Sequence, residues 1–127
     1  MTCGAVPPLV AMLEASHRPS MLAAAAGALM SVTVEKPAKE PAIASGAVPA
    51  LAKLLRTHQS DERLLLNVLQ LVSNLAEHDD GREALLEPEC LEAIGFIQRN
   101  TPSSLLERSA AGALRIIRTK YLGQTGV

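Results

Sequence analysis

Two short clusters of polar residues in this sequence carry side chains that could do chemistry. His78, Asp79 and Asp80 are adjacent, and an imidazole beside two carboxylates is a donor set that a metal ion can use. The segment from Glu87 to Cys90 places two carboxylates beside a thiol, which are groups used in acid–base and nucleophilic catalysis. However, adjacent loop residues seldom supply a closed coordination shell, and the second cluster fits the acidic first turn of a helix. We therefore predict no metal site, no cofactor site and no catalytic residue.

Composition and motifs exclude several other classes of function. The sequence contains no glycine-rich phosphate loop, no HExxH motif and no GxSxG motif. A net charge of −1 provides no basic field for nucleic acid. The longest apolar stretch, Met21 to Val34, is shorter than the roughly 18 to 20 residues that span a bilayer. The N-terminus lacks the basic region of a signal peptide, and Cys3 and Cys90 form no CxxC pair. We predict a cytoplasmic protein that is not an enzyme and has no nucleic-acid, membrane or small-molecule partner.

The elements that position these residues are indicated by an internal repeat. The block Gly4 to Val10 returns as Gly46 to Ala52, a displacement of 42 residues, and an eroded third copy is Glu89 to Ile94. A second block, Ala25 to Leu29, recurs letter for letter as Ala110 to Leu114, 85 residues later. Two blocks that keep the same spacing indicate a repeat of about 42 residues, a length typical of helical solenoids.

Each repeat also has the apolar periodicity of a helix. In the middle repeat, apolar residues recur at i, i+1, i+4, i+7, i+8 and i+11 from Leu64, which places a wide apolar stripe on one helix face. The pattern predicts a helix that begins after Ser60 as its N-cap and ends near 78–81, and a second helix over 102–120 with Thr101 as its N-cap. Gly46 permits the sharp turn before the shorter helix that follows it.

One polar segment interrupts the helical pattern. Residues 35–41 contain two prolines and stand where the middle repeat has the helix-like stretch 81–86. We predict an exposed connector that has lost a short first helix, with a binding motif in this loop as the alternative.

Four segments of the chain resemble armadillo repeats: Gly46–Leu55, Val72–Ala76, Arg82–Leu86 and Leu91–Ile94. The resemblance covers nearly the whole chain. It implies three helices per repeat in a right-handed superhelix, whose third helices line a concave groove for extended partners. The expected fold class is an all-α, armadillo-type α-solenoid of about three repeats, the first incomplete. One domain would span 1–127, with approximate repeats 4–34, 35–78 and 79–120 and a short tail at 121–127.

A closer similarity is to the armadillo proteins of the radial spoke in motile cilia. It is carried by Ala25–Met30, Thr33 with Val34, Asn67, Leu75–Glu77 and Gly81–Leu85. This resemblance implies a structural subunit of an axonemal assembly, located in a cilium or flagellum, with other proteins as partners. The alternative is a cytoplasmic armadillo adaptor, unrelated to cilia, that binds an extended peptide or a partner helix.

The armadillo proteins of nuclear import resemble this sequence less. Their third helices carry a Trp and, four residues later, an Asn that together hold an extended basic peptide. The Trp positions correspond to Gly27, Gln70 and Gly112 here, and of the Asn positions only Asn74 is kept. Binding of a nuclear localisation signal by that ladder is therefore not expected.

Two surfaces are predicted to bind partners. Asn67, Gln70 and Asn74 lie at i, i+3 and i+7 of the middle helix and share one polar face, which the resemblance places in the groove. The second surface is an exposed N-terminal face, because residue 5 opens the second helix of a repeat and solenoid ends need polar caps. We expect it to dock on another chain or on the rest of a longer solenoid. The residues of this face are Val6, Leu9, Val10 and Leu13. The competing class, a helical enzyme or small-molecule binder, would need a pocket where His or carboxylate side chains converge.

Overall fold

The computed structural model describes the backbone of residues 2–125 and the side chains of residues 4–118. Within these ranges the regular structure is entirely helical, with eight α-helices after a 3-10 turn, η1, at Thr2–Ala5. The helices are α1 Val6–Ala15, α2 Pro19–Val32, α3 Lys36–Ala44, α4 Ala47–Thr57, α5 Glu62–Ala76, α6 Asp79–Leu85, α7 Pro88–Asn100 and α8 Ser104–Thr125.

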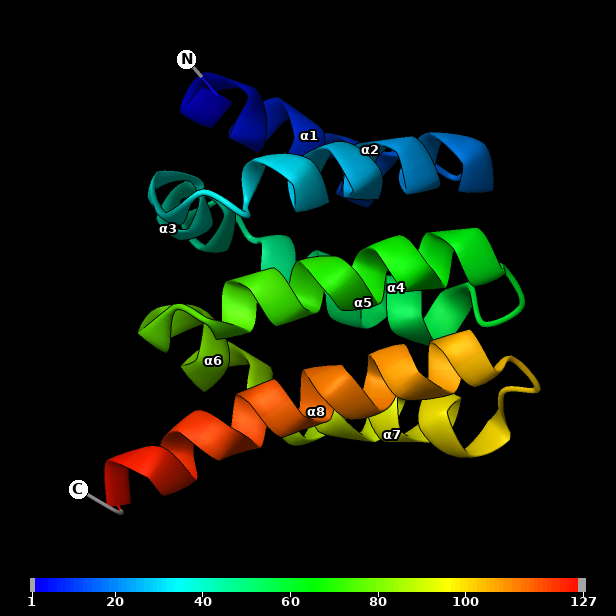
Figure 1. Cartoon of the computed structure of the whole chain (residues 1–127). Helices are drawn as coiled ribbons and strands as arrows, with labels where there is room; N and C mark the ends of the chain where they lie inside the picture. Colours follow the sequence, from blue (N-terminus) through cyan, green and yellow to red (C-terminus); the bar gives the residue numbers. More distant parts are fainter. Residues whose placement is uncertain (1, 126–127) are drawn as a thin grey trace.

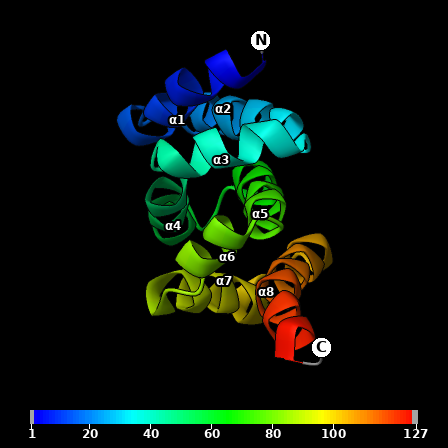
Figure 2. The same cartoon turned by 90° about the vertical axis from the view of Figure 1, so that its left-hand side faces the viewer.

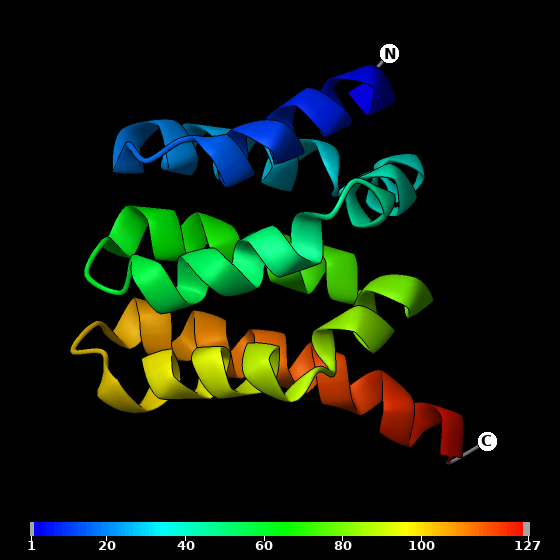
Figure 3. The ribbon, with the colours of Figure 1, turned by 180° about the vertical axis from the view of Figure 1, so that it is seen from behind.

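The helices stack in three layers from the N-terminus to the C-terminus (Figure 1). The helix pairs α1 and α2, α4 and α5, and α7 and α8 each form one layer, and α2, α5 and α8 lie side by side on one face. The opposite face is formed by α1, α4 and α7 (Figure 3). The short helices α3 and α6 lie across one edge of the stack (Figure 2). The chain is an α-solenoid, as the repeat predicts, with two helices in the first layer and three in each of the others.

A single hydrophobic core runs through all three layers. It is built almost wholly from Ala, Val, Leu and Ile, and the helices pack closely because so many of these side chains are small. At the seam between α2 and α5, a Cβ on Gly27 would lie 3.2 Å from Nδ2 of Asn67. The predicted inward positions of the middle repeat are buried as expected, including Val48, Leu51 and Leu55.

The predicted connector at 35–41 is wrong, because this segment forms most of helix α3. Pro37 lies in the first turn of α3, where a missing backbone N–H costs little, and Pro41 lies inside the helix. The helix forms because it packs against α1, α4 and α6 and buries Ala38, Lys39 and Ala42. Tertiary burial has therefore overridden a weak local propensity.

Two predicted helix caps are displaced along the chain. The N-cap of α5 is Asp61 in place of Ser60, and its Oδ1 accepts a hydrogen bond of 3.0 Å from the backbone N–H of Leu64. Helix α8 begins at Ser104, because the hydroxyl of Ser103 accepts from the N–H of Leu106 at 3.2 Å. Thr101 instead accepts from the N–H of Ser103 within the preceding turn. Helix α8 continues past 120 to Thr125, and 126–127 of the predicted tail lie outside the described residues.

Gly46 adopts the left-handed conformation that its predicted role requires, with φ of 90°. This conformation, which residues with a side chain rarely adopt, reverses the chain between α3 and α4. Gly4, its counterpart in the first repeat, lies in η1 without a positive φ.

Candidate protein-interaction surface

The three residues predicted to line the groove have different roles in the structure. Asn67 Nδ2 donates to the carbonyl of Ala23 at 2.9 Å, and Asn74 Nδ2 donates to the carbonyl of Met30 at 2.9 Å. The side chains of both asparagines therefore join α5 to α2 by hydrogen bonds. Gln70 alone is exposed, and its Nε2 donates to Asn74 Oδ1 at 3.2 Å. The prediction that all three share a solvent-facing surface is wrong for Asn74, which is buried, and only partly right for Asn67.

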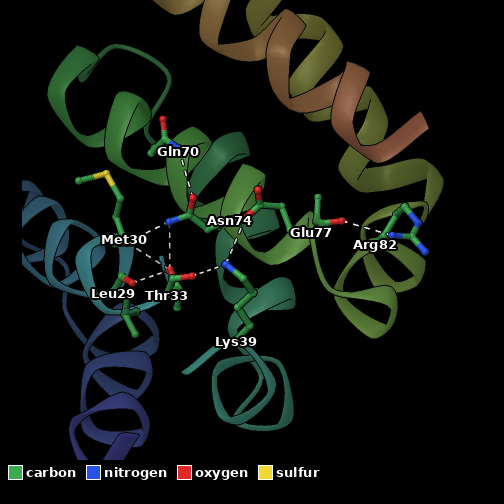
Figure 4. A network of polar contacts seen from close by, with 9 residues as sticks. Leu29, Met30, Thr33, Lys39, Gln70, Asn74, Glu77 and Arg82 are labelled. Atoms are coloured by element: carbon green, nitrogen blue, oxygen red, sulfur yellow. Dashed lines mark hydrogen bonds and ion pairs between the residues drawn. The ribbon is translucent and has the colours of Figure 1, made fainter. Parts of the chain in front are cut away.

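Asn74 lies at the centre of a polar network that joins the first two layers (Figure 4). Its Nδ2 also donates to Thr33 Oγ1 at 3.2 Å, and that hydroxyl donates to the carbonyl of Leu29 at 2.6 Å. The ammonium of Lys39 donates to the carbonyl of Thr33 and forms an ion pair of 3.2 Å with Glu77. A cation at the C-terminal end of α2 is favourable for the helix dipole. The network therefore explains why Lys39 is buried, and it links α3 to the C-terminal ends of α2 and α5.

A trough between α5 and α8 forms a hollow on the face that α2, α5 and α8 make. It has a volume of about 230 Å³. Gly112 leaves it open, since a Cβ at this position would meet nothing within 4 Å. Its described lining holds no histidine and no carboxylate, whereas the two hollows between α4 and α7 are lined in part by the carboxylates of Glu87, Glu89 and Glu92. The lining residues are Leu69, Gln70, Ser73, Arg108, Ser109, Gly112 and Ile116.

The segment from Glu87 to Cys90 forms the start of α7, as the structural alternative predicts. Cys90 is buried and lines a hollow of about 390 Å³ between α4 and α7. A second hollow of about 330 Å³ shares Arg56 and Glu89 with the first. Arg56 pairs with Glu89 across this seam at 3.5 Å. Burial raises the pKa of the Cys90 thiol, and the nearby Glu87 carboxylate raises it further. The thiol is therefore held in its neutral, weakly nucleophilic form.

The acidic cluster at His78 works as a helix start. The ring Nδ1 of His78 accepts from the backbone N–H of Asp80 at 3.1 Å, which caps α6, and Asp79 accepts from Arg82 Nη2 at 2.8 Å. Among the described residues, no three His, Cys, Asp or Glu side chains come together in a way that could hold a metal ion. In the same part of the chain, no helix has the length and apolar character needed to cross a membrane.

The predicted N-terminal face is wrong for three of its four residues. Val6, Val10 and Leu13 are 0%, 1% and 3% exposed and belong to the core, while Leu9 is partly buried. The apolar stripe of α1 points inward because α1 packs against α2, α3 and α4, all of which follow it in the chain.

Comparisons with known proteins agree with this architecture. The family model of the Armadillo/beta-catenin-like repeat matches residues 2–29. No curated protein matches the sequence. Among solved structures, a crystal structure of an engineered protein superposes with a TM-score of 0.81 at 22% identity, over 91% of this chain and 47% of that chain. The chain thus spans about half the length of that engineered protein, and the likeness shows the shared fold.

The repeat match and the three-layer fold together support an armadillo-repeat protein. Armadillo repeats are typical of protein-interaction scaffolds.

Proposed function

We propose that this chain is a non-catalytic scaffold whose trough between α5 and α8 receives a segment of a partner protein. The observation that carries the proposal is the trough itself. Leu69 and Ile116 give it an apolar floor, while Gln70 and Arg108 provide an amide and a guanidinium on its rim. This combination suits a partner segment that inserts an apolar side chain and offers carbonyl or carboxylate oxygens to the rim.

The partner that we propose is a subunit of the axonemal radial spoke. The support is the similarity of Ala25–Met30, Leu75–Glu77 and Gly81–Leu85 to the C-terminal part of radial spoke head protein 14, together with a fold suited to structural assembly. On this proposal the chain works in the cilium or flagellum. A cytoplasmic adaptor that binds an extended peptide or helix through the same trough is the alternative, and it differs only in its partner.

The experiment fills the trough and follows the protein into axonemes. Gly112→Phe places a ring in the trough, and Ala11→Phe places the same ring on the exposed outer surface of α1 as a matched control. Tagged forms are expressed in motile ciliated cells, and demembranated axonemes are assayed for each. We expect wild type and Ala11→Phe to be retained and Gly112→Phe to be lost, with equal helicity for all three.

The other outcomes separate the parts of the proposal. If none of the three forms is retained in axonemes, the radial spoke is wrong and the cytoplasmic adaptor is favoured. If Gly112→Phe is retained as well as wild type, partner binding does not use the trough.

A further inference from the structure

A row of three hollows follows the seam between α4 and α7. Figure 3 shows these two helices side by side, on the face of the molecule opposite the trough. The first two hollows, described above, share Arg56 and Glu89, and a third of about 150 Å³ shares Gln59 and Phe96 with the second. Because each hollow shares residues with the next, the three are neighbours, and we call the row the outer groove.

The first hollow, near the start of α7, has an apolar floor. Val48, Ala52 and Cys90 line it and are 5%, 7% and 5% exposed. Ile43 and Ala84 line the same hollow, so apolar side chains reach it from α3, α4, α6 and α7. A hollow of about 390 Å³ with this floor is suited to an aliphatic side chain, because its burial there removes apolar surface from water.

The middle of the outer groove is acidic. Glu87, Glu89 and Glu92 line the first two hollows together with one cation, Arg56, which gives a formal charge of −2. Arg56 is already paired with Glu89 at 3.5 Å. Glu87 and Glu92 are exposed and form no ion pair with any residue whose side chain is described. The lining therefore leaves two carboxylates that can receive a cation from another molecule.

Phe96 adds a second group that favours a cation. It is the only phenylalanine of the chain, is 42% exposed and lines both the second and the third hollow. Glu92 and Phe96 are four residues apart in α7, so they are neighbours on its surface. A lysine or arginine in the second hollow can therefore contact a carboxylate and the face of an aromatic ring together.

The dimensions of the outer groove favour an extended segment. Its lining runs along α7 from Glu89 to Asn100, a rise of about 16 Å at about 1.5 Å per residue. Alternate side chains of an extended chain lie about 7 Å apart on one side, so side chains at i, i+2 and i+4 can occupy the three hollows in turn. A helix, which is about 10 Å across, is too wide to enter hollows of this size.

We propose that the outer groove binds an extended segment of a partner protein in which an aliphatic side chain and a lysine or arginine stand two residues apart. The aliphatic side chain enters the hollow over Cys90, and the cation lies beside Glu92 and Phe96. The trough has Arg108 on its rim and no carboxylate in its described lining, so the two surfaces favour segments of opposite charge. The inference therefore goes beyond the proposed function and does not rest on it.

Titration of the isotope-labelled full chain with synthetic peptides, followed by NMR, tests the proposal. The probe is acetylated and amidated Ser-Leu-Ser-Arg-Ser-Val-Ser, and two matched peptides carry Glu in place of Arg or Ser in place of Leu. We expect the probe to shift the amide signals of Ala52, Cys90, Glu92 and Phe96, and to bind at least about tenfold more tightly than either matched peptide. Absence of these shifts, or equal affinity of the Arg and Glu peptides, would overturn the proposal.

Matched variants locate the cation. Glu92→Lys reverses a charge in the outer groove, and Glu107→Lys makes the same reversal at an exposed position of α8 that lines neither the groove nor the trough. We expect Glu92→Lys to weaken binding of the Arg peptide by at least about tenfold and Glu107→Lys to leave it unchanged. Phe96→Leu keeps an apolar contact but removes the ring, and should weaken binding by about threefold. Equal effects of the two charge reversals would contradict the assigned site.

Two further results distinguish other occupants. The groove signals of the chain alone should be the same in dilute and concentrated samples, whereas a concentration-dependent shift there would make a second copy the occupant and overturn the proposal. Gly112→Phe, which fills the trough, should bind the Arg peptide as wild type does. Shifts confined to Gln70 and Ile116 would place the peptide in the trough and also overturn the proposal. Failure of this proposal and failure of the trough proposal are thereby separate results.

Discussion

Two helical glycines allow a sharp test of the packing described above. Gly81 lies in the first turn of α6, and a Cβ built there would be 2.1 Å from the carbonyl oxygen of Leu75 and 3.0 Å from Cδ1 of Ile43. An ordinary contact between such a carbon and an oxygen is about 3.3 Å, so Gly81→Ala would force α5 and α6 apart by more than about 1 Å. Gly112 lies within α8, where an added Cβ would meet nothing within 4 Å. The same substitution therefore meets backbone at one site and open space at the other.

The two glycines should respond with opposite signs. Alanine is favoured over glycine in a helix by about 1 kcal/mol, which is the effect expected for Gly112→Ala. At Gly81 this gain is outweighed, because forcing a methyl group into a packed site costs about 1 to 3 kcal/mol, and more where the obstacle is backbone. We expect a net loss of about 3 kcal/mol in the free energy of unfolding for Gly81→Ala, a large part of the roughly 5 to 15 kcal/mol of a small domain.

Urea denaturation followed by circular dichroism at 222 nm measures both effects. With an m value of about 1.5 kcal/mol per molar, the midpoint should fall by about 2 M for Gly81→Ala and rise by about 0.7 M for Gly112→Ala. Equal midpoints for Gly81→Ala and wild type would refute the close approach of α6 to the end of α5. A loss of stability in Gly112→Ala would show that the trough is filled, contrary to the description above.

Three further predictions concern the polar network and the buried thiol. Asn74→Ala should lower the free energy of unfolding by about 1 to 3 kcal/mol, because it leaves the buried Thr33 hydroxyl without a donor from α5. Gln70→Ala, at an exposed site, should change the free energy of unfolding by less than about 0.5 kcal/mol in the same urea assay. Lys39→Met should lower the free energy of unfolding by about 1 to 3 kcal/mol, because the carbonyl of Thr33 loses its partner. Glu77→Gln should lower it by no more than about 1 kcal/mol, because the Glu77 side chain is 60% exposed. Similar losses for the two variants would contradict the network. In a Cys3→Ser background, iodoacetamide at pH 8 should alkylate Cys90 more slowly than a free cysteine, because a raised pKa leaves less thiolate at any pH below it. Glu87→Gln should speed the reaction, because it removes a carboxylate that raises the pKa of the thiol. Labelling at the rate of free cysteine would contradict the burial of Cys90.

The helical repeat itself could be predicted from the sequence because it depends on local patterns. The apolar residues from Leu64 to Leu75 recur with the period of an α-helix, which predicts a helix there. The block Ala25–Leu29 recurs intact in α8. The left-handed Gly46 was predictable for the same reason, since its role depends on its own backbone. Helix α3 was not predictable in this way, because its two prolines lower local propensity and its stability comes from packing against α1, α4 and α6.

The directions of side chains were decided only by the tertiary structure. Periodicity places Asn67, Gln70 and Asn74 on one side of α5, but it does not tell whether that side meets solvent or the carbonyls of α2. In the same way, periodicity identifies the apolar stripe of α1 without telling which neighbour covers it. The sequence by itself determined the long helices of the middle and last repeats and the length of the repeating unit, because those depend on neighbours along the chain. Which surface each layer leaves open depends on contacts between residues about 42 positions apart, which no local pattern contains.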